Sequence, residues 1–175
     1  MRLKDVITAV NAMRRDGVIE RYAIGGAVGA TFYLEPVATL DVDIFVSSKT
    51  MSGQLIVSPQ PIFDYLKAGG ATVDGEYLVI AGWPVQFLPP TSTLVEEALA
   101  EAREVDVEGE TAHVFTAEHL VAIALQAGRA KDKARVAQFV EAGVLDANRL
   151  DDVLARHGLS EKWRRIEQLF QEDAT

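Results

Sequence analysis

Apolar and polar positions follow two different periods along the chain, and each change of period marks a predicted element. Apolar residues within 3–15 recur at helical spacing, which predicts an amphipathic helix. Short apolar runs at 21–24 and 41–46 have the length of strands, and in the second run polar residues occupy alternate positions. The first part of the chain is therefore predicted to alternate helices with strands.

Turn residues divide the rest of the chain. Gly69-Gly70 and Pro89-Pro90 each end a predicted element. The further predictions are helices at 27–34, 61–68 and 91–102, hairpins at 77–88 and 105–115, a mobile polar loop at 47–58, and helices from 116 onward. Strands first and helices last predict an α+β fold, with a mixed β-sheet core, flanking helices and a helical C-terminal part. We expect a single domain over 1–175, with an α/β core at 1–115 and the helical part at 116–175.

Two aspartates stand at the start of the second predicted strand. In Asp41-Val42-Asp43 the strand geometry places both carboxylates on one face, roughly 6–7 Å apart at a rise of about 3.3 Å per residue. Like charges at this spacing favour protonation unless a cation lies between them, and Mg²⁺ is the expected cation. By themselves the two aspartates are equally consistent with solvent-exposed polar residues at the start of a strand.

A glycine pair, Gly25-Gly26, follows the first strand and precedes a predicted helix of small residues. Such a turn exposes backbone N–H groups at a helix N-terminus, where a phosphate can approach without meeting a Cβ. An ordinary turn with small residues chosen for packing is the alternative. A dinucleotide-binding turn fits less well, because its fingerprint needs glycine where Ile24 stands, and its ribose-binding acid should end the strand that Asp41 and Asp43 begin.

A basic segment joins two of the predicted C-terminal helices. Asp132 lies inside it and has the helical spacing to pair with Arg129 or Arg135. By charge pattern alone this segment is most simply a solvated, salt-bridged start of a helix. Its four cations are Arg129, Lys131, Lys133 and Arg135.

In this order, the three motifs resemble those of the nucleotidyltransferase superfamily, in the small stand-alone branch related to the toxin-type nucleotidyltransferases of bacterial abortive-infection systems. The resemblance runs from Tyr22 to about Val136. It implies that Gly25 and Gly26 contact a nucleoside triphosphate and that Asp41 and Asp43 bind the catalytic metal. It also implies that Arg129 and Lys131 of the basic segment face the triphosphate.

In that family a third carboxylate on a neighbouring strand completes the site and helps to activate the acceptor hydroxyl. Here the corresponding strand spans 83–88, and Gln86 occupies the matching position. Glutamine is uncharged and cannot act as a base. Asp74 and Glu76 lie in the turn before the preceding strand and are interpreted as solvated. We therefore expect metal binding to be weaker than in the family pattern.

Composition restricts the classes of function. The 175 residues are 49% hydrophobic and 25% charged, as in an ordinary globular protein, and the lack of cysteine excludes disulfides and thiol chemistry. The formal net charge of -9 opposes broad binding to nucleic acid. No apolar run is long enough to cross a bilayer and no signal-peptide pattern is present, which predicts a cytoplasmic protein. The three histidines, His113, His119 and His157, show no close metal-ligand spacing.

The residues support two hypotheses from different classes. The first is an enzyme that uses Mg²⁺ to transfer a nucleoside monophosphate from a nucleoside triphosphate to a hydroxyl of a protein, an RNA or a small molecule. The second, motivated by Gln86, is a catalytically degenerate module that binds a nucleotide or a protein, as one half of a toxin–antitoxin pair. The apolar face with Trp163 and Phe170 is expected to pack in the core, with a protein partner or a second copy of the chain as the alternative.

Overall fold

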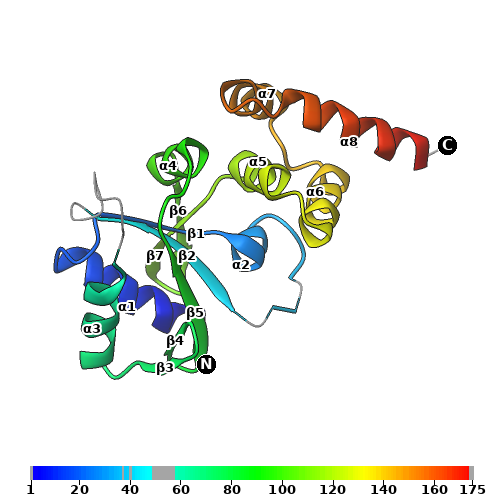
Figure 1. Ribbon diagram of the computed structural model, residues 1–175. Coiled ribbons are helices and arrows are strands. Elements are labelled where there is room, and N and C mark those ends of the chain that lie inside the picture. The colour runs from blue at the N-terminus through cyan, green and yellow to red at the C-terminus, as the bar shows by residue number, and fades with distance from the viewer. Residues whose placement is uncertain (1, 37, 40, 49–57, 174–175) are drawn as a thin grey trace.

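The computed structural model describes residues 2–36, 38–39, 41–48 and 58–173. Within these ranges seven strands form one sheet in the order β3-β4-β5-β2-β1-β7-β6 (Figure 1). β2 pairs in parallel with β5, and β1 with β7, while the other neighbours are antiparallel. The predicted mixed sheet core is confirmed. The strands are β1 (Arg21–Ile24), β2 (Val42–Ser47), β3 (Thr72–Asp74), β4 (Tyr77–Ile80), β5 (Trp83–Leu88), β6 (Arg103–Val107) and β7 (Glu110–Val114).

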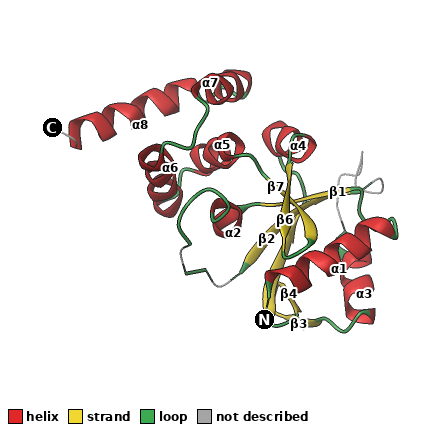
Figure 2. Ribbon diagram, turned by 180° about the vertical axis from the view of Figure 1, so that it is seen from behind, coloured by secondary structure: helices red, strands yellow, loops and turns green. Residues whose placement is uncertain are grey.

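Helices cover both faces of the sheet (Figures 1 and 2). On one face lie α1 (Leu3–Arg15) and α3 (Gln60–Ala68). The opposite face carries α2 (Gly26–Ala30), α4 (Thr93–Ala100) and α5 (Ala117–Ala127). Outside α5 follow α6 (Ala130–Ala142), α7 (Ala147–Arg156) and α8 (Ser160–Asp173), which form the predicted helical C-terminal part. None of the helices in the described ranges has the length and apolar character of a membrane span.

Side chains alternate along β2 between a face buried in the core and a face whose polar groups are accessible. Val42, Ile44 and Val46 are at most 1% exposed and pack with α1 and α3. Asp43 and Phe45 alternate with them and point to the opposite face, where both are half-buried. Because successive side chains of a strand point to opposite faces, burial of the three aliphatic residues directs the carboxylate toward α2 and α5.

A second apolar cluster joins the sheet to the C-terminal helices. Phe115, at the end of β7, and Phe139 of α6 are fully buried in it, and Trp163 of α8 is 9% exposed. Phe170 packs against the same cluster, so the predicted core role is confirmed for Trp163 and Phe170, whereas Leu169 of the same predicted face is 58% exposed. Burying one large apolar side chain contributes about 1.5–3 kcal/mol, so this cluster holds the helical part firmly against the sheet.

Three local predictions differ from the structure. β3 was predicted as part of a turn, and its fully exposed pattern shows why, since an edge strand without buried alternate positions carries no period-two signal. The second strand begins at Val42, so Asp41 precedes it. The helix after the glycine pair ends at Ala30 rather than 34, because the N–H groups of Phe32 and Tyr33 donate to carbonyls three residues back and the chain continues as turns. The loop predicted at 47–58 lies largely outside the described residues.

Candidate functional site

The glycine turn and the second aspartate occupy the same place at the end of β1. The backbone N–H of Gly25 donates to the carbonyl of Asp43 over 3.0 Å. Gly26 has φ +57°, and a Cβ at this position would overlap a carboxylate oxygen of Asp43. Both the positive φ and the close approach require glycine here. The turn therefore brings an open stretch of backbone directly against a carboxylate.

The other glycines of this segment serve packing. A Cβ on Gly25 would lie 2.7 Å from the Phe45 ring and 3.1 Å from the Phe115 ring. A Cβ on Gly29 would lie 2.9 Å from the carbonyl oxygen of Ile24. The packing interpretation of the small residues therefore holds for Gly25 and Gly29, whereas Gly26 is the position where glycine gives access to a functional group.

Asp41 and Asp43 line one pocket of about 570 Å³ between the sheet, α5 and α6. Burial raises the pKa of Asp43, and the negative charge of Asp41 raises it further. Two carboxylates that share a volume in this way favour a cation between them. Thr39 borders the same pocket, and its hydroxyl donates to the carbonyl of Asp41 over 3.2 Å.

Gln86 lies beside Asp43 in the sheet. The two residues are register partners in the parallel β2–β5 pair, and both line the pocket. Directly paired residues of neighbouring strands project to the same face, so the amide is presented next to the carboxylate. Asp74 pairs with Tyr77 from β3, three strands from β2, and does not line this pocket. The oxygen donors at the centre of the site are thus two carboxylates and one neutral amide.

The basic segment reaches the pocket through a sharp turn between α5 and α6. Gly128 ends α5 with φ +66°, and Arg129 is the N-cap residue of α6. The Arg129 guanidinium donates to the buried Asp132 carboxylate over 2.6 Å, which raises the pKa of Arg129. The predicted pairing of Asp132 with a neighbouring arginine is confirmed. Arg129 lines the pocket but is held by this cap.

Lys131 and Arg135 are the cations of α6 that face the carboxylates. Both line the pocket, and within the described residues neither side chain forms an ion pair. Their positive charges lower the pKa of Asp43. Lys131 has the largest effect of the three cations, Arg135 a smaller one and Arg129 the smallest. Lys133 borders a different cavity, next to Lys162 of α8. The segment therefore divides into cations that face the site and cations that do not.

The remaining wall of the pocket is apolar. It is formed by one side of α5 together with the ends of β5 and β7. A pocket with both an apolar wall and charged groups suits a ligand that has an aromatic ring at one end and anionic groups at the other. The residues of this wall are Leu88, Phe115, Leu120, Ile123, Ala124 and Ala127.

Sequence reasoning did not select Arg135 or Tyr77, and both line the pocket. Arg135 follows Lys131 by four residues, so helical periodicity alone was enough to place the two cations on one face. Tyr77 carried no such signal, because its place depends on how β4 pairs with β5. The predicted residues Gly26, Asp41, Asp43, Gln86, Arg129 and Lys131 all border one pocket, while Gly25 lies behind it.

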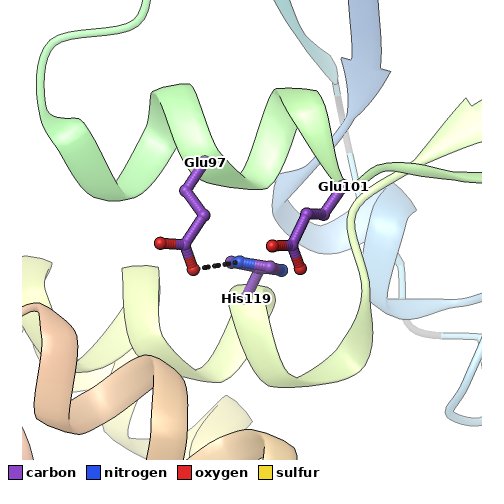
Figure 3. A group of neighbouring side chains, drawn as sticks. All are labelled: Glu97, Glu101 and His119. Atoms are coloured by element: carbon purple, nitrogen blue, oxygen red, sulfur yellow. Dashed lines mark hydrogen bonds and ion pairs between the residues drawn. The ribbon is translucent and has the colours of Figure 1, made fainter.

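A second group of polar side chains lies between α4 and α5 (Figure 3). Ligand atoms of Glu97, Glu101 and His119 lie within 4.8 Å of one another, a spacing that a metal ion could use. Each carboxylate already has a cationic partner, because Arg156 contacts Glu97 at 2.8 Å and Arg149 contacts Glu101 at 3.7 Å. These guanidinium groups oppose a further cation at the same carboxylates.

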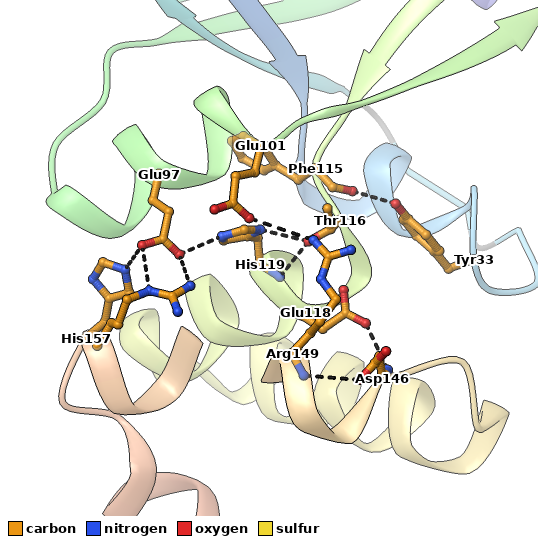
Figure 4. Close-up of polar contacts among 11 residues, drawn as sticks. Tyr33, Glu97, Glu101, Phe115, Thr116, Glu118, His119, Asp146, Arg149 and His157 are labelled. Carbon is orange, nitrogen blue, oxygen red and sulfur yellow. Dashed lines mark hydrogen bonds and ion pairs between the residues drawn. The ribbon is translucent and has the colours of Figure 1, made fainter. Parts of the chain in front are cut away.

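Glu97 connects three helices (Figure 4). One carboxylate oxygen accepts from Arg156 and contacts the fully buried His119 at 3.1 Å, and the other contacts His157 at 2.9 Å. The hydrogen bond from Arg156 is the main cause that lowers the pKa of Glu97 to about 2, with the two histidines adding to it. Sequence spacing gave no sign of this arrangement, which joins histidines of α5 and of the end of α7. We interpret it as an ion-paired clamp that fixes the C-terminal helices.

Comparison with known proteins shows which solved structures have a similar fold. No protein-family model matches the chain, and no curated protein matches its sequence. The crystal structure of ANT(2'')-Ia in complex with adenylyl-2''-tobramycin is similar at a TM-score of 0.53 and 12% identity, covering 90% of this chain and 97% of that one. The crystal structure of an antigenic nucleotidyltransferase-like protein from Paracoccidioides brasiliensis is similar at a TM-score of 0.50 and 14% identity, covering 94% of both chains. The protein therefore has a nucleotidyltransferase-like fold.

Proposed function

We propose that the protein transfers a nucleoside monophosphate from a nucleoside triphosphate to an acceptor hydroxyl and releases pyrophosphate, with Mg²⁺ as its cofactor. One observation carries this proposal: the Gly26 backbone, the carboxylates of Asp41 and Asp43, and the cations Lys131 and Arg135 meet in one pocket. A metal–triphosphate complex needs both charge types, anionic groups for the ion and cationic groups for the phosphates. Nucleotidyl transfer depends mainly on such positioning and electrostatics.

The carboxylates of Asp41 and Asp43 would hold the Mg²⁺, with the amide oxygen of Gln86 as a neutral third donor. This donor set fits the ion, because all three side chains offer oxygen, and because burial and the charge of Asp41 raise the pKa of Asp43 even though the cations of α6 lie nearby. When bound, the ion polarises phosphate oxygens and neutralises their charge.

The protein's own groups bind and orient the nucleotide. The Gly26 backbone receives phosphate oxygens, and Lys131 and Arg135 stabilise the negative charge that develops on the departing pyrophosphate. Gly25, predicted in the same role as Gly26, donates its N–H to the carbonyl of Asp43 and supports the turn from behind. Arg129 was predicted in the same role as Lys131. Because Asp132 holds its guanidinium, we propose that Arg129 mainly fixes the start of α6 and contributes its charge at longer range. The apolar side of α5 receives the nucleoside.

Two further observations support the proposal. The order of the glycine, aspartate and basic motifs resembles the nucleotidyltransferase superfamily. ANT(2'')-Ia, which has a similar fold, was solved with adenylyl-2''-tobramycin, an acceptor that carries an adenylyl group. Membership of the abortive-infection branch, a cytoplasmic location and a single domain over 1–175 are predictions that rest on sequence.

Calorimetric titration of ATP, GTP, CTP and UTP with Mg²⁺ tests the proposal. We expect at least one nucleotide to bind to the wild type and to lose most of its affinity in the Asp41→Asn/Asp43→Asn double variant. Asp74→Asn is the matched control, because Asp74 is exposed on the same sheet but lies outside the pocket. Equal binding by the double variant and the control would disprove the assignment of the site.

Gln86 favours the second candidate function, a degenerate module that binds a nucleotide or a protein partner. Its amide replaces an acid directly beside Asp43. A degenerate module predicts nucleotide binding without release of pyrophosphate for any acceptor. Coupled detection of pyrophosphate, on the same samples used for calorimetry, distinguishes this function from transfer.

A further inference from the structure

Tyr77 continues the row of side chains that begins at Asp43. Asp43 pairs with Gln86 across β2 and β5, and Leu78 pairs with Val85 across β5 and β4. Continuing the second register by one residue sets Tyr77 opposite Gln86. Directly opposed residues share one face of a sheet, so all three side chains project toward the pocket. The strand spacing of about 4.8 Å places the Cα atoms of Tyr77 and Asp43 about 10 Å apart.

Two observations agree with this placement. Tyr77 is half-buried and lines the same pocket as Asp41 and Asp43. Burial raises the pKa of its phenol, and the charges of Asp41, Glu76 and Asp43 raise it further. The phenol is therefore neutral at physiological pH and lies within electrostatic reach of both site carboxylates. Glu76 precedes Tyr77 in the chain, its charge acts on the phenol, and its carboxylate is able to take up the phenolic proton.

The other tyrosine hydroxyls are committed elsewhere. Tyr22 donates to Asn11 at 2.8 Å, Tyr33 to the carbonyl of Phe115 at 2.8 Å, and Tyr65 to Asp16 at 2.5 Å. These three and Tyr77 are all the tyrosines of the chain. Tyr77 is thus the tyrosine whose hydroxyl belongs to the proposed site, on the side of Gln86 that faces away from Asp43.

We propose that Tyr77 is itself an acceptor hydroxyl, so that the protein attaches a nucleoside monophosphate to its own chain. This inference rests on the proposed function. The phenolic oxygen of Tyr77 forms a bond to the α-phosphorus of the nucleoside triphosphate, and the bond from that phosphorus to the bridging oxygen breaks. Pyrophosphate leaves, and the phenolic proton passes to Glu76 and on to water. Nothing is oxidised or reduced.

Modification of Tyr77 would also block the site. A nucleotidyl group on Tyr77 would occupy the pocket that must admit the next nucleotide, so each chain would react once and then close its own site. Modification of Tyr77 is therefore a means by which nucleotide supply limits the activity.

Intact-mass measurement tests this on the full chain, incubated with each of the four nucleoside triphosphates and Mg²⁺. We expect an added mass of one nucleotidyl group, with peptide mapping that locates it on Tyr77. Tyr77→Phe should abolish the addition while nucleotide binding persists. Tyr65→Phe, which removes a hydroxyl far from the pocket, should retain it in full. Glu76→Gln should slow the addition and shift its pH dependence, since the proton acceptor is removed.

Calorimetry on the same preparations separates two kinds of failure. If the group is found on Thr39 or another residue, the assignment of Tyr77 is wrong and the proposed function stands. If a nucleotide binds but no mass is added, the assignment of Tyr77 is also wrong, and release of pyrophosphate with external acceptors then decides between transfer and the degenerate module. If no nucleotide binds, the proposed function fails and this inference fails with it.

Discussion

Gly26 and Asp43 are so close that the one cannot carry a Cβ without displacing the carboxylate of the other. The contact arises because β1 and β2 are antiparallel and the turn after Ile24 folds back over the start of β2. Gly26 also has φ +57°, a conformation that L side chains rarely adopt. Gly26, 17 positions before Asp43 in the sequence, thus controls where the charge of this aspartate lies.

Replacing Gly26 should damage binding beyond its cost in stability. Gly26→Ala introduces a strained backbone, costing about 1–2 kcal/mol, and moves the Asp43 carboxylate. Gly158→Ala is the matched control, because Gly158 has φ +67° and open space around its Cβ position. Urea unfolding should show similar losses of stability from backbone strain in both variants. Calorimetry should show loss of nucleotide binding only in Gly26→Ala, and equal binding in the two would contradict the contact.

The carboxylate of Asp43 is expected to reduce stability in exchange for ligand binding. Its raised pKa indicates that burial and Asp41 disfavour the charged form in the folded protein. Asp43→Asn should therefore raise the free energy of unfolding in metal-free buffer at neutral pH, while it weakens Mg²⁺-dependent nucleotide binding about tenfold or more, or by at least about 1.4 kcal/mol. Thermal unfolding with a chelator measures the first effect. A less stable variant would contradict the electrostatic interpretation.

Restoring a third acid should strengthen metal binding. Gln86 is the register partner of Asp43, so Gln86→Glu adds a carboxylate beside the existing pair without changing the length of the side chain. We expect Mg²⁺ to bind about tenfold more tightly, a change of the size seen when a metal's supporting groups are altered. Gln138→Glu adds the same charge at an exposed position of α6 and serves as control. Unchanged metal affinity in Gln86→Glu would mean that the amide does not face the ion.

The cations of α6 should not be equivalent. Lys131 lines the pocket, whereas Lys133 borders another cavity on α6. Because a hydrogen bond to a charged group contributes about 1.5–3 kcal/mol, Lys131→Ala should weaken nucleotide binding about tenfold or more. Lys133→Ala should leave the affinity nearly unchanged. Both variants should be titrated with a nucleoside monophosphate and with the triphosphate. The loss of affinity in Lys131→Ala should be larger for the triphosphate, because Lys131 is proposed to contact the additional phosphates.

The clamp at Glu97 should make stability depend on pH. The pKa of Glu97 is lowered from 4.5 to about 2, so its contribution is fully present above pH 4.5 and is lost as pH falls toward 2. Glu97→Gln should lower the free energy of unfolding at pH 7 by about 1–3 kcal/mol, because Arg156 and His119 lose a charged partner. Glu96→Gln, exposed on the same helix, is the control. The difference between wild type and Glu97→Gln should shrink below pH 4.5.

Local pattern was sufficient for most elements of the fold. Residues such as Val6, Val10 and Met13 recur on one helix face, and Val42, Ile44 and Val46 alternate along a strand, so burial of one face leaves a direct trace in the sequence. β3 left no such trace, because an exposed edge strand is held by pairing with β4 rather than by burial. The order of strands in the sheet was also invisible, since hydrogen bonds between distant segments are not recorded in local periodicity.

Residue identity and order alone predicted which chemical groups the site contains: a glycine turn, two acids separated by one residue, a glutamine where an acid was expected, and a basic segment. Only the tertiary structure decided which of them meet. The β2–β5 register put Gln86 beside Asp43, the β4–β5 register added Tyr77, and the Asp132 cap held Arg129 while Lys131 and Arg135 faced the carboxylates. The physical reason is that side-chain identity is local, whereas proximity depends on strand pairing and helix packing across the whole chain.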